Sequence, residues 1–251
     1  MRLPQLLVST ETPVAPGVVR YSLLIARESE EVAAAQRLRH QIFAGELGAK
    51  LHGPPGMDVD EFDERCDHLL VREDGSGEIV GCYRMLPPGR AGGLYSEREF
   101  DLSALAPLRP ALVETGRSCV HPEHRSGAVM SLMWAGIARY MTLTGHQYLT
   151  GCSSVPLADG GSLARGVWDV VSAKHFSPPH YRVRPLLPWD PDGAVAPPRP
   201  VLPPLLRGYL RLGAWVCGRP AFDPDFACAD LLVLLPMERI DRRYLRFLLG
   251  E

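Results

Sequence analysis

The sequence has little of what would assign it to a special class of protein. Its 251 residues carry 27 basic and 29 acidic side chains, a formal net charge of -2, whereas nucleic-acid-binding surfaces depend on a surplus of Lys and Arg. The longest apolar runs, 129–137 and 231–236, are far shorter than the roughly 20 residues of a membrane-spanning helix. The N-terminal apolar run is too short for a secretory signal peptide. We therefore expect a cytoplasmic protein that neither binds nucleic acid nor crosses a membrane.

Signals for metal or disulfide chemistry are also scarce. None of the six cysteines forms a CxxC pair and several stand in apolar runs, which predicts buried free thiols rather than bridges or zinc ligands. His121 and His124 lie close in sequence but lack a third His or Cys at ligand spacing, so we expect no metal. Ser153 and Ser154 stand outside a GxSxG turn, which argues against a nucleophilic serine.

Apolar periodicity predicts an α/β protein. Strand-like runs occupy 18–26, 66–72, 78–86, 111–120, 147–152 and 229–236, the second and third forming a hairpin, and helices are expected over 30–46, 126–144, 162–175 and 237–250. We divide the chain into an irregular N-terminal segment (1–17), a core (18–177), a proline-rich connector (178–204) and a C-terminal extension (205–251). The extension is too short for a core of its own and is expected to pack on the rest as one domain.

The segment 113–125, VETGRSCVHPEHR, carries the strongest chemical signal. Glu114 and Arg117 have opposite parity in a regular strand, but a bulge at Gly116 would bring both side chains to one face. A structural salt bridge at a strand end is the alternative.

Two further features suggest a charged cleft on a sheet. An acidic run from Asp58 to Asp67 could hold a cationic amine or could simply be a solvated loop. Arg84 stands in an otherwise apolar strand and should have a carboxylate partner. Arg125, Ser126 and Gly127 precede a helix whose amides could receive a phosphate or pantetheine arm, although a polar turn that only caps the helix would look the same.

Several segments in the same order resemble those of GNAT-related N-acyltransferases that acylate ornithine and, more distantly, of acyl-homoserine-lactone synthases. They are RLRHQIF (37–43), DVDEFDERCDHLLV (58–71), VGCYRMLP (80–87), LYSEREFDLSAL (94–105), ETGRSCVHPEHR (114–125) and, typical of the ornithine branch, LPPLLRGYLRLGAWVCGRPAFDPDF (202–226). The resemblance implies a GNAT-like fold, with a mixed central sheet flanked by helices and a C-terminal extension packed on it.

The resemblance also implies a reaction and a set of site residues. A (3-hydroxy) fatty acyl group would pass from the phosphopantetheine thioester of acyl carrier protein, or alternatively CoA, to the α-amine of ornithine, giving lyso-ornithine lipid without a bound cofactor or metal. Glu114 and Arg117 match the catalytic pair. The implied substrate-binding residues are Arg39, Phe43, Asp60, Asp63, Arg84 and Phe100, and the implied donor-binding residues are Val120, Arg125, Ser126 and Gly127.

General chemistry assigns roles to some of these residues. An ammonium must lose a proton before it can attack a thioester, which makes Glu114 the candidate base, directly or through water. Arg117 would hold Glu114, and strand amides near Gly116 would stabilise the oxyanion. Asp60 and Asp63 would attract the positive groups of the amino acid, while Arg84 or Arg39 could face its carboxylate.

The product would be amphiphilic, so we expect peripheral contact with the inner face of the membrane. Ile240, Tyr244, Phe247 and Leu248 can share one face of the last helix, a pattern that fits an interface but also a helix packed on the core. Two other functions stay open: an N-acyl amino acid or signal synthase with a different amine acceptor, and a non-catalytic protein that binds acyl carrier protein.

Overall fold

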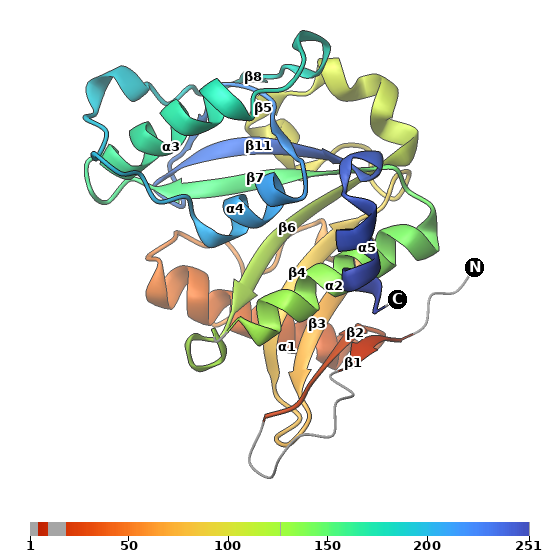
Figure 1. The fold of residues 1–251 in the computed structure, drawn as a ribbon. Coiled ribbons are helices and arrows are strands. Elements are labelled where there is room, and N and C mark those ends of the chain that lie inside the picture. Colours follow the sequence, from red (N-terminus) through yellow and green to blue (C-terminus); the bar gives the residue numbers. More distant parts are fainter. Residues whose placement is uncertain (1–4, 10–18, 126, 251) are drawn as a thin grey trace. The chain divides into compact units, whose positions relative to one another are not determined.

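A computed structural model describes residues 5–9, 19–125 and 127–250 (Figure 1). The chain forms two compact units that alternate along the sequence. The first comprises 1–87, 116–146 and 242–251, and the second comprises 88–115 and 147–241. The proline-rich connector 178–204 lies wholly within the second unit.

The first unit contains an antiparallel run of four strands. These are β1 (Leu6–Ser9), β2 (Tyr21–Ile25), β3 (Asp67–Glu73) and β4 (Ile79–Leu86). The second half of β6 (Leu112–Val120) follows β4 in the sheet. Helix α1 (Ser29–His40) packs on β3 and β4, α2 (Ala128–Thr144) packs on β1 to β3, and α5 (Arg242–Leu249) packs on α2.

The second unit is built on the first half of β6 and on β7 (Tyr148–Pro156), which run parallel. Strand β11 (Cys228–Pro236) pairs antiparallel with β7, β10 (Ala221–Asp223) and β9 (Trp215–Val216). Strands β5 (Phe100–Asp101) and β8 (Arg184–Pro185) form a separate two-residue ladder. The helices are α3 (Ser162–Lys174), α4 (Pro204–Arg211) and the 3-10 segments Tyr95–Arg98 and Ser103–Ala111.

The fold class expected from the sequence is confirmed: the protein is a mixed α/β structure with a sheet flanked by helices. The hairpin of β3 and β4 forms as expected, because turn residues separate two runs that can bury their apolar side chains. The helix expected over 30–46 starts as α1 and continues as a π-helix, Gln41–Glu46.

Two elements differ from the expectation. Strand β1 lies inside the segment 1–17 that we expected to be irregular, where its short Leu-Leu-Val run is stabilised by pairing with β2 and by packing against α2. Strand β7 continues to Pro156, beyond the expected end at residue 152, because β11 pairs with it along its whole length.

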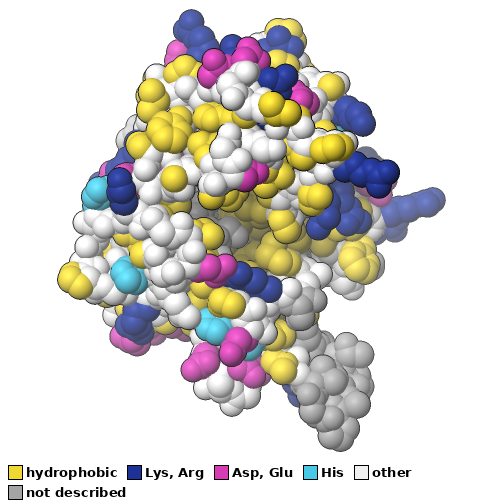
Figure 2. Space-filling view, turned by 90° about the vertical axis from the view of Figure 1, so that its left-hand side faces the viewer, with side chains coloured by type: hydrophobic (Ala, Val, Ile, Leu, Met, Phe, Trp, Pro, Cys, Tyr) yellow, Lys and Arg dark blue, Asp and Glu magenta, His cyan; other side chains and the backbone are white. Residues whose placement is uncertain are grey.

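The cysteines are free, as the sequence predicts, and the surface carries a mixture of side-chain types. All six cysteines are free, and Cys82, Cys119, Cys217 and Cys228 are buried. Side chains of both charge signs and hydrophobic side chains lie together on the face shown in Figure 2, in keeping with the near-balanced composition. Within the described ranges, every helix is too short or too polar to span a bilayer.

Candidate active site

Glu114 is a buried carboxylate on the first half of β6, with 4% of its surface exposed. It accepts hydrogen bonds from the backbone amides of Tyr95 and Ser96, at 2.6 and 2.8 Å, and from the Ser96 hydroxyl at 2.5 Å. Hydrogen bonds of this kind stabilise a carboxylate anion and fix its orientation.

The local sequence explains why these amides point at Glu114. Tyr95 and Ser96 open a 3-10 helix, so their N–H groups have no acceptor within the helix. The carboxylate of Glu97 in the same turn accepts from the preceding amide, that of Leu94, at 3.0 Å. The turn therefore satisfies one amide itself and presents two to Glu114.

The backbone of β6 departs from regular strand geometry close to the expected bulge. Gly116 is the residue that the sequence singled out, but the positive φ lies one residue later, at Arg117, with φ 54°. The register of β6 with β7 runs from Leu112 to Glu114, opposite Tyr148 to Thr150. The regular pairing thus ends at Glu114 itself.

Three arginines and three aspartates of the first unit form a buried network, here called the Arg–Asp cluster. Its members are Arg39, Arg84, Arg117, Asp58, Asp60 and Asp63. Arg39 binds Asp58 at 2.9 Å and Asp63 at 2.7 Å. Arg84 binds Asp60 at 2.5 Å and Asp63 at 3.0 Å, and Arg117 binds Asp58 at 3.0 Å and Asp60 at 3.4 Å.

The carboxylate partner predicted for Arg84 from the sequence is thus present, as Asp60 and Asp63. Burial by itself raises the pKa of Asp63, but its hydrogen bond and ion pair with Arg39, followed by the charge of Arg84, outweigh burial and hold that pKa far below its usual value. The pKa of Asp60 is also lowered, because Arg84 and then Arg117 outweigh the effect of burial. Equal numbers of opposite charges make the cluster formally neutral, and it ties the loop before β3 to α1, β4 and β6.

The two phenylalanines of the implied substrate site lie in different units. Phe43 is buried in the π-helix that follows α1. Phe100 is buried in β5 of the second unit, with 1% of its surface exposed. Their contact with substrate stays a prediction.

Of the implied donor-binding residues, Val120 ends β6 and its carbonyl accepts from the Arg125 side chain at 3.1 Å. Arg125 also forms a two-pronged ion pair with Glu46, with both hydrogen bonds at 2.7 Å. Gly127 is the N-cap of α2, with φ 92° and no side-chain capping bond. Ser126 lies outside the described residues.

A group of polar side chains that was not predicted from the sequence continues from Glu114 within the second unit. The Cys152 thiol donates to the Ser96 hydroxyl at 3.6 Å. Burial raises the pKa of Cys152, and the nearby charges of Glu99 and Asp230 raise it further. Asp230 carried a signal that could have found it, since it is the only charged residue in the apolar strand β11. Glu99 carried none, because it stands in the polar run Ser-Glu-Arg-Glu.

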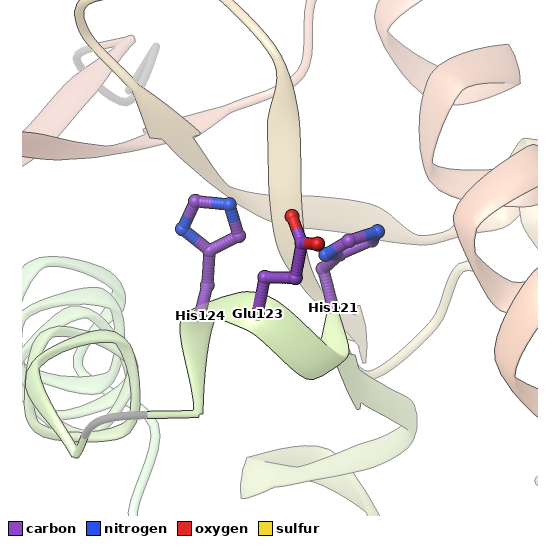
Figure 3. A group of neighbouring side chains, drawn as sticks. All are labelled: His121, Glu123 and His124. Carbon is purple, nitrogen blue, oxygen red and sulfur yellow. The ribbon is translucent and has the colours of Figure 1, made fainter.

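His121, Glu123 and His124 bring potential ligand atoms within 4.8 Å of one another (Figure 3). The turn after β6 thus places a carboxylate, that of Glu123, as a third potential ligand beside the two histidines, which the histidine spacing alone did not reveal. One ring nitrogen of His124, Nδ1, is 2.9 Å from the Tyr21 hydroxyl. That the protein uses no metal stays a prediction.

Comparison with known proteins identifies the family. A model of the acetyltransferase (GNAT) domain matches residues 38–135. The L-ornithine N(alpha)-acyltransferase of Rhizobium meliloti is 36% identical over 250 residues, which cover 89% of this chain and 82% of the relative. The enzyme of the same name from Rhodobacter capsulatus is 32% identical, with 93% and 96% covered.

Solved structures show the same fold at low sequence identity. The CoA-dependent acyl-homoserine lactone synthase BjaI superposes with a TM-score of 0.55 at 20% identity, over 88% of this chain and 81% of that chain. FeeM, an N-acyl amino acid synthase from uncultured soil microbes, superposes with a TM-score of 0.51 at 12% identity, over 89% and 94%. The full-length matches above establish that this chain is an N-acyltransferase and belongs to the L-ornithine N(alpha)-acyltransferase family.

Proposed function

We propose that the protein transfers a 3-hydroxy fatty acyl group from the phosphopantetheine thioester of acyl carrier protein to the α-amine of ornithine. The product is lyso-ornithine lipid. The names and full-length coverage of the relatives support ornithine as the acceptor. The structural observation that carries the proposal is the buried Glu114 carboxylate, held by three hydrogen bonds at the point where β6 and β7 stop pairing.

Glu114 serves the acceptor in this proposal. The α-ammonium of the amino acid pairs with the carboxylate and loses a proton to it, directly or through one water. The neutral amine then attacks the thioester carbonyl, and the tetrahedral oxyanion is stabilised by backbone amides where β6 leaves regular geometry, near Gly116 and Arg117. Collapse of this intermediate forms the amide bond, breaks the carbon–sulfur bond and releases the phosphopantetheine thiol.

The Arg–Asp cluster has a positioning role. Its carboxylates are already paired with arginines, so Asp60 and Asp63 attract the amino acid through the field of the whole cluster rather than as free anions. Arg117 belongs to this cluster and follows Glu114 by three residues, so the cluster fixes one end of the irregular segment of β6. We also propose that Arg117 holds the Glu114 carboxylate in place.

Acyl carrier protein is preferred over CoA as the donor because the turn before α2 has a single glycine, Gly127, and is not a repeated-glycine loop of the kind that cradles phosphates. The amphiphilic product further implies work at a membrane surface, which we propose to be the inner face of the membrane.

The test is an assay of the purified protein with a panel of amino acids and with the same 3-hydroxyacyl group on carrier protein or on CoA. Free thiol and product mass are followed together. We expect thiol release that depends on ornithine and on carrier protein, with an amide product. Thiol release with another amine and not with ornithine would refute ornithine as the acceptor. Equal kcat/KM with the CoA thioester and the carrier-protein thioester would refute the preference for acyl carrier protein as the donor.

The role of Glu114 is tested in the same assay with Glu114→Gln, which keeps the shape of the side chain but removes its charge. We expect kcat to fall by about a hundredfold or more. Glu238→Gln, an exposed residue in the same unit, is the matched control and should behave as wild type. Normal turnover by a folded Glu114→Gln variant would remove Glu114 from the mechanism.

A further inference from the structure

A buried tyrosine of the second unit contacts the strand that carries Glu114. Tyr209 is in helix α4 and has 1% of its surface exposed. Its hydroxyl oxygen lies 2.9 Å from the hydroxyl oxygen of Thr115, so α4 lies beside β6 (Figure 1). Thr115 is buried and follows Glu114 directly in the chain. The reaction proposed above gives neither Tyr209 nor Thr115 a role.

The Tyr209 hydroxyl belongs to a buried chain of hydrogen bonds. The Thr115 hydroxyl donates to the backbone carbonyl of Thr150 on β7 at 3.2 Å. Since a hydroxyl has a single hydrogen to donate, Thr115 then accepts from Tyr209. Thr150 is fully buried, and its own hydroxyl donates to the Val233 carbonyl of β11 at 2.8 Å. We call Tyr209, Thr115 and Thr150 the hydroxyl chain, and it links α4 to three strands of the second unit.

The hydroxyl chain lies where β6 and β7 separate. Their parallel pairing ends with Glu114 opposite Thr150, whereas β7 continues to Pro156 in pairing with β11. Thr115 is thus the first residue of β6 beyond the paired stretch. The bond from Thr115 to Thr150 joins the two strands at this point, and Tyr209 binds the same Thr115 hydroxyl from α4.

The direction of the backbone at Thr115 matters for the proposed reaction. Glu114, the proposed base, immediately precedes Thr115, and the amides proposed to stabilise the oxyanion begin at Gly116, immediately after it. A shift of the chain at Thr115 therefore moves the base relative to the amides. Misplacement of reacting groups by about 1 Å can cost about a hundredfold in rate.

We propose that Tyr209 is a positioning residue for acyl transfer, whose hydroxyl holds Thr115 so that β6 leaves β7 with Glu114 in its productive orientation. The inference rests on the proposed function, because it needs Glu114 to be the base. Tyr209 acts through Thr115 and transfers no proton to or from the substrate. Buried hydrogen bonds suit this role, because their donors and acceptors are costly to leave unpaired.

The first test is Tyr209→Phe, which removes the hydroxyl and keeps the ring. We expect kcat to fall by about tenfold or more, while KM for ornithine and for the carrier-protein thioester stays as in wild type. Tyr140→Phe is the matched control, because Tyr140 is equally buried and its hydroxyl donates to Asp67 at 2.7 Å in the first unit. Both variants should melt at a lower temperature than wild type, and only Tyr209→Phe should lose kcat. Unchanged kcat in Tyr209→Phe, or equal losses of kcat in the two variants, would overturn the proposal.

Thr115 allows a second test that does not depend on the folding of Tyr209→Phe. Thr115→Ser keeps the hydroxyl and should keep most of the wild-type kcat, whereas Thr115→Val keeps the shape, loses the hydroxyl and should be as slow as Tyr209→Phe. The Tyr209→Phe/Thr115→Val double variant should be no slower than Thr115→Val alone, because the two hydroxyls act as a unit. Equal losses in the Ser and Val variants, or additive losses in the double variant, would speak against the hydroxyl chain.

Two measurements show whether Tyr209 acts through Glu114. Tyr209→Phe introduced into Glu114→Gln should cause no further loss of kcat, and an undiminished further loss would contradict the positioning role. The dependence of kcat on pH should keep its shape in Tyr209→Phe and be lowered by one factor throughout. Loss of one limb of the profile would show that Tyr209 itself transfers a proton, which also contradicts the proposal.

The failure of this inference can be told from the failure of the proposed function. The variants are assayed with whichever amine wild type acylates, so an acceptor other than ornithine leaves the test of Tyr209 intact. Normal turnover by Glu114→Gln would remove the proposed base and the role of Tyr209 with it. A slow Glu114→Gln beside a fully active Tyr209→Phe would overturn only the positioning role.

Discussion

Arg39 is the most buried arginine of the Arg–Asp cluster, with 1% of its side chain exposed, and it binds both Asp58 and Asp63. Arg39→Ala leaves these two carboxylates buried with a partner missing, which should lower the free energy of unfolding by about 3–5 kcal/mol. Urea unfolding measures this. Arg37→Ala on the same helix is the control, because its partner Glu30 is exposed, and it should cost less than about 1 kcal/mol. Equal losses in the two variants would contradict the structural role of the cluster.

The His121, Glu123 and His124 group allows a direct check on the expectation that no metal takes part. Thiol release should be unchanged after prolonged treatment with EDTA and removal of the chelator. A loss of activity that Zn²⁺ restores, and that His124→Ala reproduces, would show that the expectation is wrong.

A site residue could be predicted from the sequence where a charged side chain stands in an otherwise apolar strand. Arg84 and Glu114 are charges in apolar strands, and the structure gives each the buried partners that such a position demands. Ser96 could not be found this way, because its contribution includes a backbone amide whose direction depends on a turn. The burial of the Glu99 Oε2 atom could not be found this way either, because Glu99 stands in a polar run of the sequence.

Among the elements, β7 depends on a glycine. A Cβ atom on Gly151 would lie 2.3 Å from the backbone carbonyl of Thr115 on β6, too close for any side chain. Gly151→Ala should therefore force β6 and β7 apart at the end of their paired region and cost about 1–3 kcal/mol. Gly92→Ala, where a Cβ meets nothing within 4 Å, is the control. A wild-type melting temperature for Gly151→Ala would show that the strands tolerate the separation.

Helix α5 divides its apolar residues between two environments. Leu248 is buried and the helix packs on α2, but Phe247 is 73% exposed and stacks on Tyr244 at a centroid distance of 6.0 Å. The sequence placed all of them on one face, and the exposed ring is what remains available to a lipid surface. Phe247→Ser should reduce flotation with anionic liposomes and leave the melting temperature unchanged, whereas equal flotation would limit α5 to packing.

Helices and strands could be predicted where the sequence of the element itself carries the whole hydrophobic repeat. Residues 30–46 carry a helical repeat and 66–86 carry two strands with a turn, and both formed as expected. Strand β1 has too few residues to show a period, and the length of β7 is set by its partner β11. The presence of β1 and the length of β7 both depend on pairing with another segment of the chain. A local sequence pattern does not predict such pairing.

For the whole molecule, two sets of carboxyls predict an unusual dependence of stability on pH. The lowered pKa values of Asp60 and Asp63 contribute stability above about pH 4 that is lost as the pH falls further. The raised pKa of Glu99, about 9, acts in the opposite direction, since stability is lost as the pH rises from about 4.3 towards that value.

We therefore expect the carboxyl contribution to the free energy of unfolding without substrate to fall below about pH 4, through Asp60 and Asp63, and to fall again as the pH rises towards about 9, through Glu99. Urea unfolding between pH 3 and pH 9 measures the profile. Glu99→Gln should remove most of the decline on the alkaline side and leave the acidic side as in wild type. Profiles that run parallel from pH 5 to pH 9 would show that Glu99 does not titrate as its burial requires.

The alternation of the two units along the chain has a consequence for synthesis on the ribosome. Both segments of the second unit, 88–115 and 147–241, are made before α5, whose helix completes the first unit. The first unit therefore stays incomplete after β1 to β4 and α2 have been translated. Until α5 is made, α2 exposes the surface that α5 later covers. Chaperones that recognise apolar segments have their best opportunity during this interval, and a slowed translation of the last codons should prolong it.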